Sequence, residues 1–310
     1  MATDLSTQHS PISGLFPQPE APEEWETYAL TEDQVDVFKE KGYVSGVQIL
    51  TDEQIETLRE ELERFFDPDH EGNELWYEYH ANESSSEDRV LFHSLGAWRI
   101  STAFHDLLWN PAFLVPASQL LAAVAEMNAD ADLSTDRTNG QAAVRFWHDQ
   151  LFCKPAEQGG VVAWHQDYSY WTRTQPMAHL TCWTGLDPAT EENGCMNYVP
   201  GSHEWDLLPL TDLADNMEAI HEVLSEKQEA QFDPVPIELE AGEGTFHHPL
   251  LVHGSYENRS DRPRRGMVLN VFHDGVRSAT DEPLLEGVPP ISAGERMEGQ
   301  FFPLLYDPSD

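Results

Sequence analysis

Basic residues are scarce in this sequence. The 310 residues include 17 Lys plus Arg against 56 Asp plus Glu, and only four of them are Lys, so the formal net charge is -39. A protein that neutralises nucleic-acid phosphates needs clustered Lys and Arg. The one basic cluster consists of Arg259, Arg262, Arg264 and Arg265. We therefore expect no nucleic-acid partner.

Cysteine and long apolar runs are scarce as well. Cys153, Cys182 and Cys195 are odd in number and lack C-x-x-C spacing, so the sequence predicts neither a disulfide framework nor a thiolate zinc site. No apolar run reaches the length of about 18 residues that a membrane span needs, and residues 1–30 lack a basic stretch followed by an apolar core. We expect a cytoplasmic protein without a membrane partner.

The acidic residues are spread along the chain and do not form one tail. We interpret this acid-rich, Lys-poor composition as a halophilic adaptation, because salt shortens the reach of repulsion between like charges. The alternative is attraction of a cationic substrate or partner, which the even distribution of charge disfavours.

The first half of the chain predicts helices. Residues 1–28 are polar and Pro-rich, and we expect an unfolded lead-in there. Thr31 and Thr51 each begin a T-x-x-Q capping box that predicts the start of a helix, and a strand is expected near residues 43–50. Asn110-Pro111 predicts a further helix to about Met127, followed by an acidic linker over residues 130–140. We assign residues 29–140 to a helical scaffold.

From residue 141 onward, short apolar or β-branched runs alternate with Gly and Pro. The predicted strands cover residues 143–154, 160–167, 179–187, 196–199, 235–239, 244–248, 250–255 and 266–273. Eight such strands are typical of a double-stranded β-helix, the cupin-like jelly roll. We predict a mainly β fold with flanking helices in one domain over residues 29–310, with a jelly-roll core at 141–275 and a C-terminal extension at 276–310.

One further segment carries a helical pattern. Residues 207–231 have apolar side chains at mixed three- and four-residue spacing, which predicts a helical insertion. This insertion either closes over the barrel mouth or packs against the outside of the fold.

Metal-ligand residue types lie within this predicted core. His165 and Asp167 are two residues apart in a predicted strand, so their side chains would point to one face. His253 would supply a third ligand from a segment far along the chain. Two His and one carboxylate leave three positions of an octahedral ion open, as in non-haem Fe(II) oxygenases. The H-x-D tripeptide alone occurs about once by chance in such a chain, so its context has to carry the interpretation.

That context is a series of motifs in a fixed order. They are D-Q-L-F-C-K-P at 149–155, W-H-Q-D at 164–167, E-N-G-C at 192–195, V-P-G-S-H at 199–203 and H-P-L-L-V-H-G-S at 248–255. The series resembles the phytanoyl-CoA dioxygenase family of Fe(II)/2-oxoglutarate-dependent oxygenases, from about residue 30 to about residue 273.

The resemblance implies a set of ligands and cofactors. Fe(II) would be held by His165, Asp167 and His253, and 2-oxoglutarate would chelate the iron. The guanidinium of Arg264 would hold the C5 carboxylate of 2-oxoglutarate. Trp183 matches an aromatic position beside the co-substrate, although core packing explains a Trp equally well.

Several assignments stay open. His247 and His248 are rivals to His253; we prefer His253 because the resemblance places this ligand in a His-Gly-Ser motif and because Arg264 follows it on the next predicted strand. Gln150 and Lys154 share one face of a predicted strand and could contact the co-substrate or the substrate. The aromatic segment 168–173 could line a substrate mouth or cover the core.

These features predict a dioxygenase that uses O2 and hydroxylates a small organic molecule. A halogenase of the same family is disfavoured, because Asp167 occupies the position that a halide would need. The alternatives are another oxidation by the same kind of enzyme and a non-catalytic jelly-roll binding protein that retains the metal.

Because like charges dominate this chain, we expect its stability to rise with salt up to molar concentration. Thermal unfolding at increasing NaCl measures this. A melting temperature that falls steadily from low to molar NaCl would contradict the halophilic interpretation.

Overall fold

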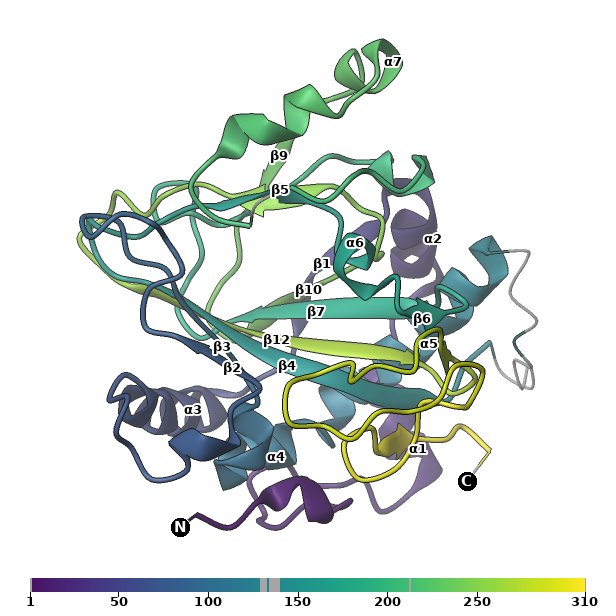
Figure 1. Cartoon of the computed structure of the whole chain (residues 1–310). Coiled ribbons are helices and arrows are strands. Elements are labelled where there is room, and N and C mark those ends of the chain that lie inside the picture. Colours follow the sequence, from purple (N-terminus) through teal and green to yellow (C-terminus); the bar gives the residue numbers. More distant parts are fainter. Residues whose placement is uncertain (1, 129–132, 134–139, 212, 310) are drawn as a thin grey trace.

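The structure is a computed structural model that describes residues 2–128, 133, 140–211 and 213–309. Two antiparallel sheets face each other, and helices cover the outer side of the larger one (Figure 1). The larger sheet has the order β1 (Tyr43–Gln48), β10 (Glu243–His247), β7 (His179–Gly185), β12 (Arg264–His273), β4 (Val144–Lys154), β3 (Phe92–Leu95) and β2 (Glu78–His80), with β14 (Leu304–Tyr306) also paired to β4. The smaller sheet has the order β5 (Val162–His165), β11 (His253–Ser255), β8 (Met196–Tyr198) and β9 (Val235–Ile237).

The chain crosses between the two sheets at almost every step of the core. In chain order, β4, β7, β10 and β12 belong to the larger sheet, and β5, β8, β9 and β11 to the smaller one, so only the step from β8 to β9 stays within a sheet. This is the double-stranded β-helix, and the predicted jelly roll is confirmed. Each of the eight predicted strands corresponds to one of these core strands.

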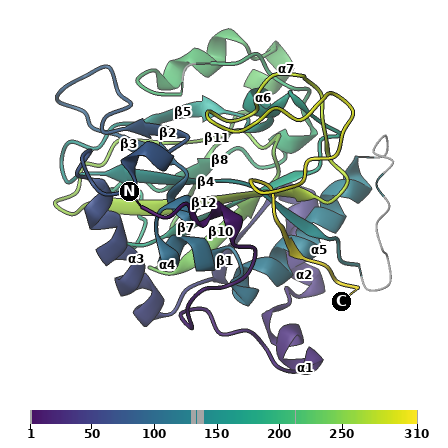
Figure 2. The same cartoon turned by 60° about the horizontal axis from the view of Figure 1, so that its bottom comes forward.

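Four helices build the outer layer on the larger sheet (Figure 2). They are α2 (Glu32–Lys41), α3 (Asp52–Phe65), α4 (Thr102–Leu107) and α5 (Pro111–Met127). Thr31 and Thr51 form the two predicted capping boxes, each with a Gln three residues later. Gly42 ends α2 with φ 83°, a left-handed conformation that favours glycine. The helix α5 packs across β4, β7 and β12, and its long apolar surface fills the space behind the sheet.

The N-terminal segment differs from the sequence prediction. Residues 2–28, expected to be an unfolded lead-in, form short turns η1 (Leu5–Thr7), α1 (Pro22–Trp25) and η2 (Glu26–Tyr28). Phe16 is buried, and the backbone amides of Ile12 and Ser13 donate to the carboxylate of Asp106 at 2.8 and 2.6 Å. These contacts, together with an ion pair between Asp4 and Arg99, order the segment, and none of them leaves a periodic pattern in the sequence.

The predicted helical insertion at 207–231 is also wrong in detail. Among its described residues are a 3-10 turn, η6 (Met217–Glu222), and the one-turn α7 (Glu226–Glu229), in place of one helix. Asn216 and Ser225 each cap the start of one of them, so two short segments form. Leu208, Met217, Ile220, Val223 and Leu224 pack on the outside of the smaller sheet in one cluster with Trp164, and α7 projects from the molecule (Figure 1).

The remaining helices and strands are short. They are α6 (Tyr168–Trp171), β6 (Thr174–Gln175), β13 (Arg277–Ser278), η3 (Asn73–Leu75), η4 (Ala97–Arg99) and η5 (Ser202–Glu204). The predicted acidic linker at 130–140 lies almost entirely outside the described residues. Within the described part of the chain, no helix combines the length and apolar character needed to cross a membrane.

The capping box of α3 provides a test of the fold. Replacing Thr51 with Ala removes the hydroxyl that accepts from the Gln54 amide, and we expect the free energy of unfolding to fall by about 1 kcal/mol. Thr51→Ser keeps the acceptor and is the control in urea unfolding at constant salt. Equal stability of wild type and Thr51→Ala would contradict the assigned role.

Candidate metal centre and co-substrate pocket

A cavity of about 380 Å³ lies between the two sheets. Its lining includes His165, Asp167 and His253, together with Arg264 and Trp183. The predicted metal ligands therefore share one cavity with Arg264 and Trp183.

Two imidazoles face each other across neighbouring strands. His165 on β5 lies directly opposite His253 on β11, and their ring centroids are 4.2 Å apart. The Nδ1 atoms lie 2.7 Å from the Ala163 carbonyl and 2.9 Å from the Leu251 carbonyl. A carbonyl only accepts, so each Nδ1 carries the proton and each Nε2 keeps its lone pair for a metal ion.

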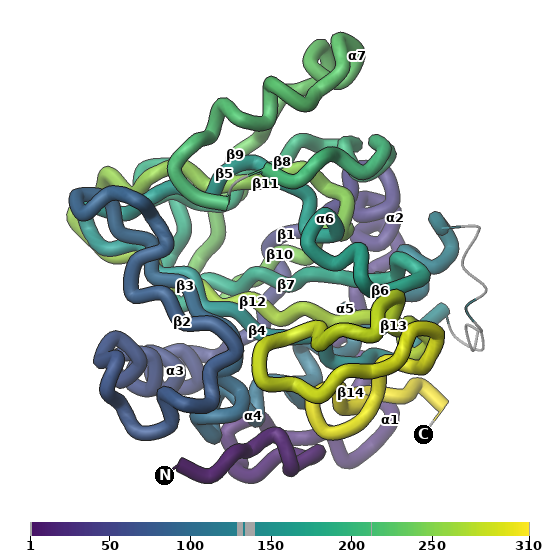
Figure 3. Tube along the Cα trace, in the orientation of Figure 1, coloured from purple at the N-terminus to yellow at the C-terminus, as the bar shows by residue number. Residues whose placement is uncertain are grey.

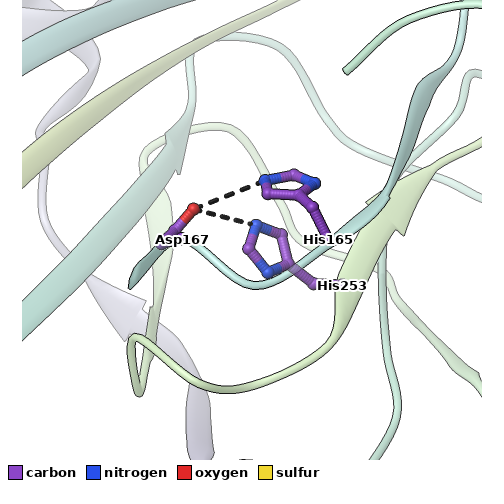
Figure 4. A group of neighbouring side chains, drawn as sticks. All are labelled: His165, Asp167 and His253. Atoms are coloured by element: carbon purple, nitrogen blue, oxygen red, sulfur yellow. Dashed lines mark ion pairs between the residues drawn. The ribbon is translucent and has the colours of Figure 1, made fainter. Parts of the chain in front are cut away.

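The carboxylate of Asp167 completes the group (Figure 4). Its Oδ1 lies 3.4 Å from His165 Nε2 and 3.5 Å from His253 Nε2. The three ligand atoms lie within 4.8 Å of one another. Two ligand atoms at a right angle, each about 2.1 Å from an ion, are about 3 Å apart, so the two distances from the carboxylate to the imidazoles are close to those that a metal needs.

The path of the chain at Asp167 differs from the prediction. β5 ends at His165, and Asp167 lies in the turn before α6 with φ -56° and ψ -42°. The two side chains therefore do not meet through the alternation of one strand. The turn carries the carboxylate back toward the rings.

The protonation states suit a cation. Burial raises the pKa of Asp167, but the neighbouring imidazoles of His253, His165 and His247 outweigh burial and hold that pKa well below its usual value. Burial and the neighbouring His165 lower the pKa of His253 well below its usual value. At neutral pH the group thus offers an anionic oxygen and a neutral His253 ring.

The second oxygen of Asp167 has contacts that sequence reasoning missed. Oδ2 lies 3.0 Å from His247 Nε2 and accepts from the hydroxyl of Thr181 at 2.6 Å. His248, the other rival ligand, instead accepts from the Leu250 amide and does not line the cavity. Nothing in the spacing of Thr181 marks it as part of the site.

Arg264 is a buried cation without a complete set of partners. Its Nη2 donates to the Gly194 carbonyl at 2.8 Å and to Ser255 Oγ at 3.3 Å, whereas Nε and Nη1 have no hydrogen-bond partner. Among the described residues, no carboxylate lies within ion-pair distance of it. Burial lowers the pKa of Arg264 to about 10, so it stays charged at neutral pH. Its neighbour Arg265 faces away and pairs with Asp187.

Trp183 lies beside this guanidinium. The Arg264 carbon Cζ is 5.2 Å from the centroid of the Trp183 ring. A Cβ at Gly266 would come within 2.4 Å of that ring. Glycine at position 266 therefore leaves the space that Trp183 occupies in the wall of the cavity.

Gln150 and Lys154 lie at different depths. Gln150 lines the cavity and accepts from Asn270 Nδ2 at 3.2 Å. Lys154 is buried behind the wall, where Nζ donates to Ser255 Oγ at 2.6 Å and to the carbonyls of Ser255 and Tyr256. Lys154 thus reaches a hydroxyl that Arg264 also contacts and does not reach the open space.

The other lining residues are mixed in character. Of the aromatic segment 168–173, Tyr170, Trp171 and Arg173 line the space, and Tyr168 does not. Glu83 and His93 also line it. Glu83 lies 3.3 Å from His93 Nδ1, and this contact holds the pKa of Glu83 below its usual value.

A family model described as phytanoyl-CoA dioxygenase matches residues 38–266. The chain belongs to the phytanoyl-CoA dioxygenase family. Proteins of this family are Fe(II)- and 2-oxoglutarate-dependent oxygenases.

Individual relatives agree with the family assignment. A phytanoyl-CoA dioxygenase of Arabidopsis thaliana is 26% identical over 82% of this chain and 93% of its own length. A probable phytanoyl-CoA dioxygenase of Caenorhabditis elegans is 29% identical over 48% of this chain, and the match spans about half of that relative (51%). The fold is similar to that of SnoK, a non-heme alpha ketoglutarate dependent carbocyclase from nogalamycin biosynthesis, with a TM-score of 0.67. The two sequences are 20% identical, and the match covers 89% of this chain and 97% of SnoK.

The metal centre predicts a specific loss of binding. Asp167→Ala removes the anionic ligand, and we expect Fe(II) affinity to fall by at least about 100-fold. Anaerobic Fe(II) titration measures the change, with Asp167→Asn, which keeps a neutral oxygen, losing less. Full iron occupancy in Asp167→Ala would rule out this ligand set.

Proposed function

We propose that this protein is an Fe(II)- and 2-oxoglutarate-dependent dioxygenase that hydroxylates a small organic molecule and releases succinate and CO2. One observation carries the proposal: a two-His, one-carboxylate group and a buried, incompletely paired guanidinium line the same cavity. A metal site alone fits many proteins, whereas this pairing fits a cation together with a dicarboxylate.

Fe(II) fits the donor set. His165 Nε2, His253 Nε2 and Asp167 Oδ1 would hold it, and three positions would remain for the other reactants. When bound, Fe(II) supplies the redox chemistry that couples reduction of O2 to oxidation of 2-oxoglutarate and of the substrate. One oxygen atom of O2 enters succinate and the other enters the hydroxylated product.

The protein would bind and orient the 2-oxoglutarate. Arg264 Nε and Nη1 are two donors of one planar fork, and a carboxylate can accept from both in parallel. Leaving them unpaired in a buried site costs free energy that a bound C5 carboxylate would offset. Trp183 would pack beside the carbon chain, and Gln150 is placed to contact the co-substrate or the substrate.

The rest of the cavity would take the substrate. Trp171 and Leu284 give its lining apolar surface, and Glu83 and His93 give it polar groups. A space of about 380 Å³ shared with 2-oxoglutarate fits a small molecule. The enclosing walls would also exclude water from the reaction.

The alternative, a non-catalytic protein that retains the metal, leaves Arg264 unexplained. Such a protein would need the three ligands but not a buried guanidinium with two unsatisfied N–H groups. Succinate release with candidate substrates separates an oxygenase from a binding protein.

We also propose that the acid-rich surface is an adaptation to high salt. Of the four lysines, Lys154 is buried, and Lys39 pairs with Glu126 at 2.9 Å. Lys41 and Lys227 are exposed. The surface thus offers few positive charges to offset its carboxylates.

The co-substrate assignment predicts the behaviour of Arg264 variants. Arg264→Ala should weaken 2-oxoglutarate binding by about 2–5 kcal/mol, or roughly 30- to several thousand-fold, because a buried carboxylate loses its charged partner. Arg264→Lys should recover only part of the loss, because a point charge cannot supply two parallel hydrogen bonds. Fe(II) binding should survive in both variants. The measurement is 2-oxoglutarate titration of anaerobic Fe(II) protein, followed by the metal-to-ligand charge-transfer band.

Arg259→Ala is the matched control. Arg259 is exposed on the turn before β12 and does not line the cavity, so its loss should leave 2-oxoglutarate binding unchanged. Arg259 follows His248 by eleven residues, as Arg264 follows His253. If Arg259→Ala abolished binding while Arg264→Ala did not, the anchor would be Arg259, and His248 would replace His253 as the favoured ligand.

A further inference from the structure

The two oxygens of Asp167 lie in different surroundings. Oδ1 faces the Nε2 atoms of His165 and His253 at 3.4 and 3.5 Å. Oδ2 is held from the other side by His247 Nε2 at 3.0 Å and by the Thr181 hydroxyl at 2.6 Å. The carboxylate therefore has a metal-facing oxygen and a protein-facing oxygen.

The direction of the bond from His247 is fixed. A carboxylate oxygen accepts hydrogen bonds, so His247 Nε2 carries the proton. Its Nδ1 lies 3.0 Å from the hydroxyl of Tyr198, which can donate to it. The chain of donors runs from Tyr198 through His247 to Asp167.

These residues come from strands that are already in register. His247 on β10 lies directly opposite Thr181 on β7, so the two donors to Oδ2 are neighbours in the larger sheet. Tyr198 on β8 lies directly opposite His253 in the smaller sheet. All of the donors are buried: Thr181 is 3% exposed, His247 1% and Tyr198 0%. Buried donors with fixed backbones hold a carboxylate in one orientation.

We infer that His247, supported by Tyr198 and Thr181, is a positioning residue that restricts Asp167 to metal ligation through Oδ1 alone. The inference rests on the proposed function and deepens it. A carboxylate freed from these donors can rotate and offer both oxygens to the ion, which would occupy a position that 2-oxoglutarate or O2 needs. Held by them, Asp167 leaves three positions open and has less orientational freedom to lose when the metal binds.

The test compares variants at position 247 by Fe(II) titration without 2-oxoglutarate under anaerobic conditions. His247→Leu fills the space but removes the donor, and we expect Fe(II) affinity to fall roughly 10- to 100-fold, as for other partners that orient metal ligands. His247→Gln can place an N–H near the position of Nε2 and should restore affinity to within a few-fold of wild type. Rescue by Gln separates a hydrogen bond from core packing.

A second readout reports on the open positions. In His247→Leu loaded with saturating Fe(II), the charge-transfer band that 2-oxoglutarate produces should be weaker or shifted, and in His247→Gln it should match wild type. His248→Leu, which removes the adjacent buried imidazole without touching Asp167, is the control and should behave as wild type in both measurements.

Each outcome decides between the two claims. If His247→Leu binds Fe(II) as tightly as wild type, or if His247→Gln is no better than His247→Leu, the positioning role is overturned while the proposed function stands. If wild type itself binds neither Fe(II) nor 2-oxoglutarate, the proposed function fails.

Should His247→Leu fail to fold, Thr181→Val and Tyr198→Phe remove single hydroxyl groups from the same network. Each should weaken Fe(II) binding by a few-fold. Unchanged affinity in both variants would overturn the inference.

Discussion

The pairing of β5 with β11 sets His165 directly opposite His253, and the site depends on this register. A slip of one residue would turn one imidazole to the opposite face of the sheet. The same ladder continues to β8, where Tyr198 lies opposite His253, and the facing sheet places Thr181 opposite His247. Two rows of paired residues thus surround one carboxylate. The backbone hydrogen bonds of both sheets hold a geometry that flexible loops would not maintain.

Two buried basic residues, Arg264 at the start of β12 and Lys154 at the end of β4, differ in how fully the protein satisfies their hydrogen bonds. Arg264 and Lys154 are cross-strand partners. Lys154 donates to three oxygens, the number of its protons, so its hydrogen bonds are satisfied by the protein. Arg264 keeps two N–H groups without a partner. Burial and the charge of Arg264 lower the pKa of Lys154 well below its usual value. An anion bound at Arg264 would offset both charges, and this difference is the reason for proposing Arg264 as the residue that binds the co-substrate.

The jelly roll could be predicted because each strand has a local pattern and the turns between strands contain Gly or Pro. The helix starts at Thr31, Thr51 and Asn110 were equally local, since a capping residue and its partner lie within a few positions. The prediction of a single helix at 207–231 was wrong, because the spacing of apolar residues does not show that Asn216 and Ser225 each start a separate short segment. The prediction of an unfolded lead-in was wrong, because Phe16 is buried against the rest of the molecule.

Within the site, the residues that belong to sequence motifs could be predicted, whereas the contacts set by the packing of the two sheets could not. The motif order singled out His165, Asp167, His253 and Arg264, and the structure places all four around one cavity. The strand argument for Asp167 was nevertheless wrong, because β5 ends two residues earlier. The contact of Thr181 with Asp167 could not be found from the sequence, since a threonine in a strand is common and its partner is set by how the two sheets pack.

The residues that would select a substrate lie largely outside the eight core strands. Arg173 follows α6 and donates to the carbonyls of Pro283 and Leu284 at 2.8 and 3.0 Å, which ties the C-terminal extension to the cavity. Leu284 and Leu285 line the space, and Figure 3 shows this yellow segment looping past β6. The family match ends at residue 266, before this wall begins. Membership of the family would therefore account for the proposed metal and co-substrate residues, while the proposed substrate pocket is built in part by a segment that the family match does not cover.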